Sequence, residues 1–144
     1  MRVLIADDDP VYQALLEDLM AQWGHQIVLA RDGAEAWEAL QAPEPPNLAL
    51  LDWMMPGMDG FELCRRIRDE RPNGDQIYVI LITGSSGGKD IIKVMVAGAD
   101  DYLIKPFDPS ELKVRLRAGM RILDLRAEIA QLKRITAEHV GAAR

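Results

Sequence analysis

The 144-residue sequence lacks several features that would place it in a particular class of protein. It has a single cysteine, Cys64, so it cannot form an internal disulfide. No apolar run approaches the roughly 20 residues that a membrane-spanning helix needs. Residues 1–5 lack the charged and apolar pattern of a signal peptide. Together these absences predict a cytoplasmic protein with no membrane contact.

Basic charge is also scarce. With 17 Lys and Arg against 23 Asp and Glu, the chain carries a formal net charge of −6, which argues against nucleic acid as a partner of the whole surface. What the sequence does have is an ordinary globular composition, 49% hydrophobic and 28% charged. A chain of this length fits one domain that buries a substantial core.

Five apolar runs of strand length alternate with segments of helical period. The runs span residues 3–6, 27–30, 48–51, 77–82 and 102–104, and they are continuous, as is typical of strands buried on both faces. Asp9-Pro10 and Asp108-Pro109 each place a capping carboxylate before a proline at the start of a helical segment. The pattern predicts five βα units, and hence an α/β fold with a parallel sheet covered by helices on both faces.

Polar side chains follow four of the five runs. Asp7 and Asp8 follow the first, Asp52 the third, Thr83 the fourth and Lys105 the fifth. Ligands of open α/β sheets bind beyond the carboxyl ends of the strands, so we expect these side chains to converge. Taken singly, each is an ordinary loop or capping residue, and the hypothesis depends on their combination.

The chemistry of this combination points to phosphoryl transfer. Clustered carboxylates repel one another unless a hard cation with oxygen ligands, such as Mg²⁺, lies between them. A lysine ammonium and a threonine hydroxyl beside the metal form a cradle for phosphoryl oxygens. Since a carboxylate can form an acyl phosphate, we interpret Asp52 as the nucleophile, with Lys105 and Thr83 at the phosphoryl group.

The segments that carry these residues resemble the response regulator receiver domain of two-component phosphorelay systems. The similarity covers about Arg2 to Leu123 and depends on four segments in order, "LIADDDP", "LLDWMMPGMDG", "LITG" and "DDYLIKPF". It implies a flavodoxin-like (βα)5 fold with strand order 2-1-3-4-5. It further implies a signalling protein rather than an enzyme, which catalyses its own phosphorylation and dephosphorylation and switches conformation to control an output partner or domain.

The resemblance also implies a role for each residue of the site. Asp52 accepts the phosphoryl group from the phosphohistidine of a sensor histidine kinase or phosphotransfer protein, and Lys105 contacts the phosphoryl oxygens. The metal is Mg²⁺, or Mn²⁺ in its place. Asp8 binds it directly and Asp7 often through water. The full set of implied metal ligands is Asp7, Asp8, Asp52 and the backbone carbonyl of Met54.

A conformational switch is implied as well. Thr83 is the switch hydroxyl, and Tyr102 is the aromatic residue that turns inward when Thr83 moves. The peptide bond before Pro106 is implied to be cis, which fits the general restriction of cis bonds to proline. The loop of residues 84–88 contains three glycines and is the segment expected to rearrange.

Other functions stay open at this point. A phosphatase similar to haloacid dehalogenases needs a second acid two residues after its nucleophile, where this chain has Met54. A flavodoxin-like cofactor binder needs a phosphate loop after the first strand, where this chain has acids that repel phosphate. A receiver whose phosphorylation is vestigial could serve only as a dimerisation module. The intact set of Asp52, Thr83 and Lys105 argues against that last function.

The final predicted helix runs past the domain, so we divide the chain into a receiver domain of residues 1–123 and a helical extension of residues 124–144. A heptad spacing joins four apolar residues and continues with two polar ones, Ile122, Leu125, Ile129, Leu132, Thr136 and His139. We favour a coiled coil that forms a homodimer. In this register Glu128 faces Lys133 of the partner subunit, whereas Arg121 faces Arg126 unfavourably. The alternative is a long helix packed on its own domain.

Residues 113–134 hold seven basic and two acidic residues. This balance would allow nucleic-acid or lipid binding, but a solvated helix face is favoured because no aromatic residues interleave with the charges. In the family such a helix commonly leads to an output domain. The chain is therefore expected to be either a fragment or a stand-alone receiver, and the sequence names neither its kinase nor its output.

Overall fold

The computed structural model describes residues 1–70, 76–84 and 88–142. Its strands form a single parallel sheet in the order β2-β1-β3-β4-β5. The bounds are β1 (Arg2–Ala6), β2 (Gln26–Ala30), β3 (Leu48–Asp52), β4 (Tyr78–Thr83) and β5 (Asp101–Ile104). The predicted α/β class and strand order are confirmed.

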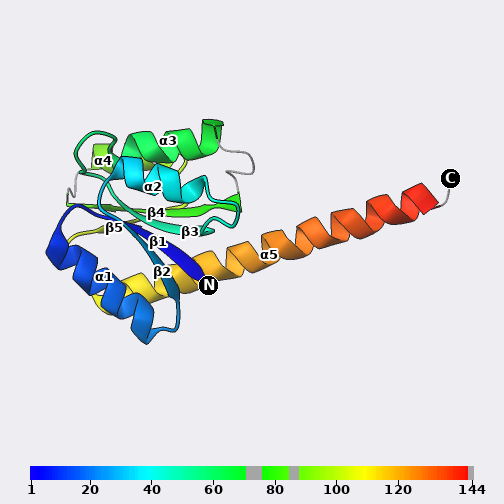
Figure 1. Ribbon diagram of the computed structural model, residues 1–144, viewed down its shortest axis with the longest axis horizontal. Helices are drawn as coiled ribbons and strands as arrows, with labels where there is room; N and C mark the ends of the chain where they lie inside the picture. The colour runs from blue at the N-terminus through cyan, green and yellow to red at the C-terminus, as the bar shows by residue number, and fades with distance from the viewer. Residues whose placement is uncertain (71–75, 85–87, 143–144) are drawn as a thin grey trace.

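Helices cover both faces of this sheet. They are α1 (Pro10–Gln22), α2 (Gly33–Leu40), α3 (Gly60–Glu70), α4 (Gly88–Val96) and α5 (Pro109–Ala142). In Figure 1, α2 and α3 lie above the sheet, whereas α1 and the first part of α5 lie below it. Each strand is followed by a helix, so the chain always returns to start the next strand at the same edge.

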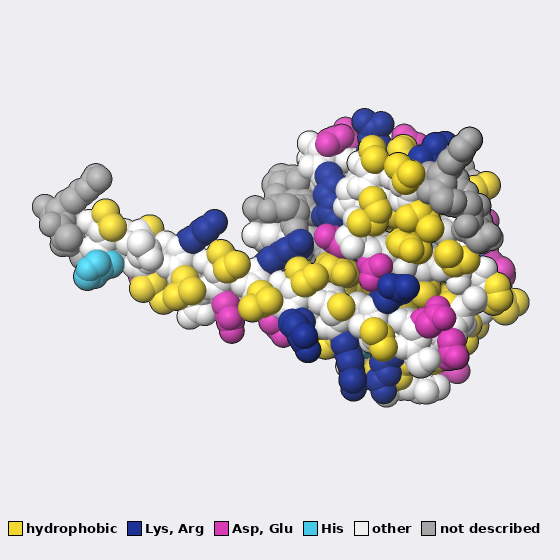
Figure 2. Space-filling view, turned by 180° about the vertical axis from the view of Figure 1, so that it is seen from behind, with side chains coloured by type: hydrophobic (Ala, Val, Ile, Leu, Met, Phe, Trp, Pro, Cys, Tyr) yellow, Lys and Arg dark blue, Asp and Glu magenta, His cyan; other side chains and the backbone are white. Residues whose placement is uncertain are grey.

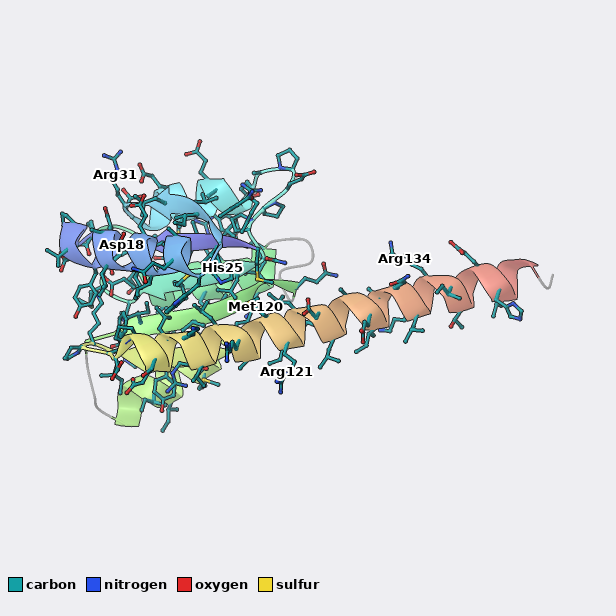
Figure 3. All side chains as sticks on the ribbon, turned by 90° about the horizontal axis from the view of Figure 1, so that it is seen from below. Asp18, His25, Arg31, Met120, Arg121 and Arg134 are labelled. Carbon is teal, nitrogen blue, oxygen red and sulfur yellow. The ribbon has the colours of Figure 1, made fainter. Side chains whose placement is uncertain are left out.

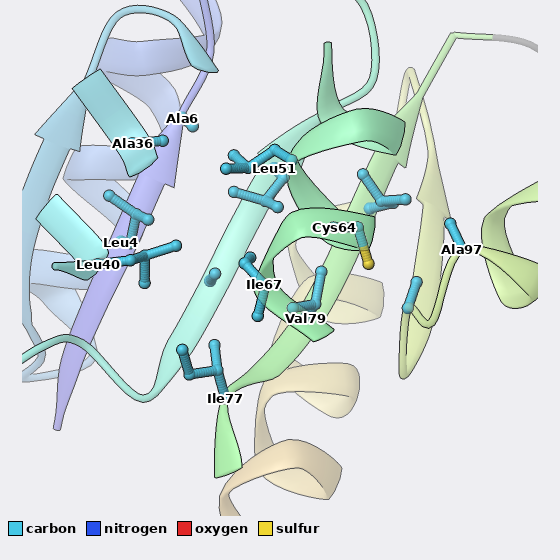
Figure 4. Packing of buried hydrophobic residues seen from close by; sticks show 14 of the residues in the cluster. Leu4, Ala6, Ala36, Leu40, Leu51, Cys64, Ile67, Ile77, Val79 and Ala97 are labelled. Carbon is cyan, nitrogen blue, oxygen red and sulfur yellow. The ribbon is translucent and has the colours of Figure 1, made fainter. Parts of the chain in front are cut away.

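The sheet is buried on both faces because successive residues of each strand point to opposite sides. Leu4 and Leu51 belong to the apolar cluster beneath α2, α3 and α4, part of which Figure 4 shows. Their neighbours Ile5 and Leu50 belong to a second cluster beneath α1 and α5. All four side chains are fully buried. Two dry faces explain why the strands read as continuous apolar runs.

The predicted start signals work as helix caps. Asp9 precedes α1, and its Oδ1 accepts a hydrogen bond of 2.9 Å from the backbone N–H of Val11, with Pro10 at the start of the helix. At the start of α5, Oδ1 of Asp108 accepts from the backbone N–H of Ser110 at 3.1 Å. These carboxylates satisfy backbone donors that the helix itself leaves unpaired. Helix α1 therefore begins immediately beyond the acids that follow β1.

The long helix α5 is tied to the domain at first and then leaves it. Arg115 forms an ion pair with Asp101 at 3.2 Å, and Arg126 lies 3.5 Å from Asp100. Residues 131–140 are all exposed, and Figure 3 shows this part projecting away from the domain. The division expected between residues 123 and 124 falls inside one continuous helix. Whether the two parts behave as separate units stays a prediction.

Within the described part of the chain, none of the helices combines the length and the apolar character that membrane crossing requires.

Candidate functional site

Three carboxylates meet at the carboxyl edge of the sheet. Asp7 directly follows β1 and is fully buried, Asp8 next to it is exposed, and Asp52 is the last residue of β3 and only 6% exposed. One oxygen from each can be chosen so that all three lie within 4.8 Å of one another. Because β1 and β3 are neighbours in the sheet, the strand order itself brings these acids together.

Lys105 provides the positive charge of the site. It follows β5, and its Nζ lies 3.1 Å from Oδ2 of Asp7 and 3.3 Å from Oδ1 of Asp52. Its side chain is only 14% exposed. The ammonium therefore bridges the two buried carboxylates and offsets part of their mutual repulsion.

Backbone contacts hold Asp7 in place. Its Oδ1 accepts a hydrogen bond of 2.9 Å from the backbone N–H of Asp9, and its own N–H donates to the carbonyl of Ala30 at 3.2 Å. The side-chain amide of Gln13, on the first turns of α1, donates to the backbone carbonyl of Asp7. The start of α1 thus fixes the position and orientation of this acid.

The segment after Asp52 turns back onto the strand that precedes it. The backbone N–H of Gly60 donates to the carbonyl of Trp53 at 2.9 Å. A Cβ at position 60 would lie 2.4 Å from the carbonyl oxygen of Asp52 and 2.9 Å from Cδ2 of Leu81. Only glycine fits so close to this backbone. The side chain of Met54, two residues after Asp52, is 71% exposed.

The electrostatics of the cluster depart from those of isolated acids. Burial raises the pKa of Asp52 to about 6, and the neighbouring charge of Asp7 adds to the rise while Lys105 opposes it. For Lys105, burial disfavours the charged form, but the hydrogen bond to Asp7 and the charge of Asp52 outweigh it and raise the pKa. The cluster therefore holds more negative charge than one ammonium can balance, which makes it a good site for a cation.

Thr83 and Lys105 lie at adjacent strand ends. Thr83 ends β4 and is 3% exposed, and its carbonyl accepts a hydrogen bond of 2.7 Å from the backbone N–H of Lys105. Tyr102 lies within β5, half-buried against the cluster beneath α2, α3 and α4. Its ring centroid is 5.7 Å from the guanidinium carbon of Arg115 on α5. The Lys105–Pro106 peptide bond is cis.

The sequence-predicted residues are thus distributed in two ways. Four of them, Asp7, Asp52, Thr83 and Lys105, are buried or nearly so at one edge of the sheet, and Asp8 lies beside them at the surface. Tyr102 lies within β5, the strand that Lys105 follows, and is farther from that edge. The loop expected to rearrange, residues 84–88, has its central residues 85–87 outside the described part of the chain.

Sequence reasoning missed three contributors to the site: Tyr12, Gln13 and Gly60. The apolar spacing of the helical segment after Pro10 includes Tyr12 and suggests only a packing role, yet the centroid of its ring lies 4.0 Å from Nζ of Lys105. One signal was available for Tyr12 and Gln13. Both belong to the first turns of a helix that begins immediately after the acids, and such turns lie at the ligand-binding edge of an α/β sheet.

Comparisons with known proteins agree with this geometry. The family model of the response regulator receiver domain matches residues 3–117, and the chain belongs to this family. It is 40% identical over 119 residues to the transcriptional regulatory protein AfsQ1 of Streptomyces coelicolor, across 83% of this chain and 50% of that protein. The chain spans about half the length of the curated relatives it matches.

Solved structures show the same fold. A CheY-like response regulator receiver domain protein from Methanospirillum hungatei superposes with a TM-score of 0.77 at 26% identity, over 87% of this chain and 97% of that one. The receiver domain of the sensor histidine kinase PA1611 from Pseudomonas aeruginosa gives a TM-score of 0.72 at 30% identity, over 85% and 97% of the two chains. That structure has a magnesium ion coordinated in its active-site cleft.

Membership of the family confirms the resemblance read from the sequence, and with it the expectation of a signalling protein. Receiver domains of response regulators interact with sensor histidine kinases, and phosphorylation by such a kinase is their general role. The phosphatase and the flavodoxin-like cofactor binder are therefore set aside.

Proposed function

We propose that this chain receives a phosphoryl group on Asp52 from a phosphohistidine and responds with a change of conformation. The observation that carries the proposal is the arrangement around Lys105, whose Nζ lies within 3.3 Å of both Asp7 and Asp52. A buried carboxylate beside a largely buried ammonium at the carboxyl end of a parallel strand suits an acyl-phosphate site.

The acid cluster fits a divalent metal. Its donors are carboxylate oxygens, which Mg²⁺ and Mn²⁺ prefer, and burial together with Asp7 already raises the pKa of Asp52. Asp7, Asp8 and Asp52 would hold the ion, with the backbone carbonyl of Met54 as a further ligand. When bound, the metal supplies charge neutralisation for the carboxylates and the incoming phosphoryl group.

The protein's own groups position the reaction. A carboxylate oxygen of Asp52 attacks the phosphorus in line with the P–N bond of the donor, that bond breaks, and the imidazole leaves. Lys105 and the hydroxyl of Thr83 then contact phosphoryl oxygens, where they offset the negative charge. Water entering along the same line hydrolyses the acyl phosphate, which returns Asp52 to its carboxylate. Both steps are autocatalysed by this site.

The response is proposed to run from Thr83 to Tyr102. Thr83 shifts toward the phosphoryl group, and Tyr102 turns into the space that this shift leaves. Tyr102 is suited to report the change because its ring already contacts Arg115 on α5 and packs on the core. The surface of β5 and α5 would thereby differ between the two states, as a two-state switch requires.

A small acyl-phosphate donor tests the chemistry without the unknown kinase. The protein is incubated with acetyl phosphate with and without Mg²⁺, and its intact mass is followed. One phosphoryl adduct is expected with Mg²⁺, and none in Asp52→Asn. Asp18→Asn, an exposed position on α1 that Figure 3 labels, is the matched control and should be phosphorylated like the wild type. A folded, Mg²⁺-binding protein that forms no adduct would favour a vestigial receiver instead.

The part of α5 from Ile122 onward is proposed to form a parallel coiled coil with a second copy of the chain. Its apolar stripe is exposed: Ile122 is 36% accessible, Leu125 50%, Ile129 51% and Leu132 63%. Figure 2 shows apolar side chains along this part of the helix. The stripe keeps the heptad spacing, and it buries its surface only when another helix covers it.

Charge supports a parallel arrangement. In the heptad that places Ile122 and Ile129 at a, Glu128 falls at g and Lys133 at the following e position, so that each Glu128 faces Lys133 of the partner subunit. Arg121 and Arg126 would face each other one heptad earlier and weaken the pairing there. Arg126 is turned to Asp100 of its own domain, which relieves part of that repulsion.

Sedimentation equilibrium tests this assembly. A concentration-dependent dimer is expected for the wild type, and Ile129→Glu should abolish it by placing a charge in the seam. Gln131→Glu adds the same charge two residues away, outside the seam, and should leave the dimer intact. A monomeric wild type, or equal effects of the two variants, would contradict a coiled coil along this stripe.

The output of the switch is proposed to be transcriptional. AfsQ1 is named a transcriptional regulatory protein, and the segment that matches this chain makes up only 50% of it. We infer that phosphorylation of this chain controls such an output through α5, in the cytoplasm where DNA is accessible. Joining α5 to a reporter DNA-binding domain and measuring transcription with Asp52 intact or replaced by Asn would test the inference.

A further inference from the structure

Tyr12, on the first turn of α1, presents the face of its ring to the ammonium of Lys105. Nζ lies 4.0 Å from the ring centroid, a distance typical of a strong cation–π contact. The same ammonium lies 3.1 Å from Oδ2 of Asp7 and 3.3 Å from Oδ1 of Asp52. One aromatic face and two carboxylates thus surround a cation that is only 14% exposed.

The ring of Tyr12 is itself held in place. Its centroid lies 6.1 Å from that of Phe107, with the planes inclined by 43°. Phe107 packs against the cluster beneath α1 and α5 and follows Lys105 by only two residues. The segment that carries the lysine therefore also carries the aromatic residue that supports Tyr12. Helix α1 and the β5–α5 connection therefore contact each other through side chains next to the ammonium of Lys105.

We propose that Tyr12 is a positioning residue for phosphoryl transfer, whose ring holds the Lys105 ammonium at the acid cluster and shields it from water. The proposal rests on Asp52 being the phosphoryl acceptor. An ammonium has three N–H donors, and a ring face attracts the charge without competing for them as a third carboxylate would. The donors stay free to turn from the carboxylates to phosphoryl oxygens as the acyl phosphate forms.

Substitutions at position 12 distinguish the contribution of the ring to the phosphorylation rate from that of the hydroxyl. Tyr12→Leu keeps an apolar side chain but removes the ring. It should slow phosphorylation by acetyl phosphate about ten-fold, which lies between the values for exposed and for fully desolvated cation–π contacts. Tyr12→Phe keeps the ring and should stay within about two-fold of the wild type. Trp23→Leu is the matched control, because Trp23 contacts Lys113 at 5.7 Å near the other end of the helix. It should leave the rate unchanged.

A double-mutant cycle tells positioning from general packing. If Tyr12 acts through Lys105, Tyr12→Leu should cause no further loss of rate in a Lys105→Gln background, because the cation it holds is gone. Phenylalanine carrying one, two or three ring fluorines at position 12 weakens the ring's attraction for cations while keeping its shape. The rate should fall stepwise with fluorine number, and this series stays informative if Tyr12→Leu does not fold.

A wild-type protein that acetyl phosphate does not modify overturns the proposed function and this inference with it. A wild type that is modified, with Tyr12→Leu or the fluorinated series equally fast, overturns the role of Tyr12 alone. So does a double variant in which the two losses multiply. A ten-fold loss for Leu, retention for Phe and no added loss beside Lys105→Gln support it.

Discussion

Nζ of Lys105 lies 3.3 Å from Oδ1 of Asp52, and this ion pair joins the ends of two strands, β5 and β3, that do not pair with each other. The strand between them, β4, ends in Thr83. The ammonium must therefore reach across a strand end to meet the carboxylate. The ammonium thus lies beside the acid at the edge of the sheet where Thr83 ends the intervening strand, and a cation in this place can offset charge on a transferred phosphoryl group.

The first prediction concerns the stability of the metal-free protein. Because burial and Asp7 raise the pKa of Asp52 from 3.8 to about 6, the folded state binds this proton more tightly than the unfolded state does. The stability that this proton contributes is complete below about pH 4 and is lost as the pH rises through about 6. Asp52→Asn removes the buried charge and should raise the free energy of unfolding at pH 7 by about 1–2 kcal/mol.

Urea unfolding in the presence of EDTA from pH 4 to pH 7.5 measures this effect. The difference between Asp52→Asn and the wild type should grow between about pH 4 and 6 and then level off. Asp18→Asn, on the exposed side of α1, removes the same formal charge away from the cluster and should not reproduce the change. A difference that is constant with pH would contradict the assigned burial and repulsion at Asp52.

The second prediction separates metal binding from phosphoryl transfer. Lys105→Gln removes a positive charge within 3.3 Å of two acids, so Mg²⁺ should bind several-fold more tightly. Phosphorylation should nevertheless slow by at least ten-fold, because the phosphoryl oxygens lose their ammonium partner. Calorimetry gives the affinity, and the acetyl phosphate assay gives the rate.

Lys113→Gln provides the control. Lys113 is on α5 and lies over the ring of Trp23 at the end of α1, so this variant should change neither the Mg²⁺ affinity nor the rate of phosphorylation. Weaker Mg²⁺ binding in Lys105→Gln would show that the lysine supports the metal site rather than competing with it.

The third prediction tests the turn behind the acceptor. Gly60→Ala places a Cβ 2.4 Å from the carbonyl oxygen of Asp52, so one of the two backbone segments has to shift. We expect the free energy of unfolding to fall by about 2–3 kcal/mol. Gly84→Ala is the comparison for stability, because nothing lies within 4 Å of a Cβ there. Urea unfolding should rank the two variants in this order, and equal stabilities would refute the close approach.

The fourth prediction concerns the support beneath β4 and β5. Arg68 on α3 donates to the carbonyls of Ile77 and Gly98 at 2.7 and 2.8 Å and to Oδ2 of Asp100 at 2.7 Å. Arg68→Met should destabilise the domain by about 3 kcal/mol, since it leaves a partly buried carboxylate short of a partner. Arg65→Met, on the exposed side of the same helix, should cost less than about 0.5 kcal/mol. Similar melting temperatures for the two variants would argue against this support.

Sequence patterns were sufficient to predict the strands, the helix starts and the polar residues at the strand ends. Each strand could be recognised as a short apolar run because both faces of the sheet are buried. This burial requires consecutive residues of a strand to be apolar, so it can be read from the strand's own residues. Asp7, Asp52, Thr83 and Lys105 could be placed at one edge because parallel strands end together, whatever their side chains do. The caps Asp9 and Asp108 were recognisable from the proline that follows each of them.

The remaining features depend on how distant segments approach one another. Tyr12 fits the apolar spacing of α1. Its contact with Lys105 joins residues that follow β1 and β5, two strands separated in the sheet by β3 and β4. The requirement for glycine at position 60 likewise arises from the return of a loop onto Asp52. Neither the contact of Tyr12 with Lys105 nor the close approach at Gly60 produces a repeating pattern that could be recognised in a single sequence.

The most direct measurement locates the phosphoryl group itself. After reaction with acetyl phosphate and Mg²⁺, borohydride reduces an aspartyl phosphate to homoserine, and mass spectrometry of the peptides identifies the position. We predict homoserine at position 52 alone, in the wild type and in Asp18→Asn. Homoserine at position 7 or 8, or its absence from a protein that binds Mg²⁺, would contradict the assignment of Asp52 as the acceptor.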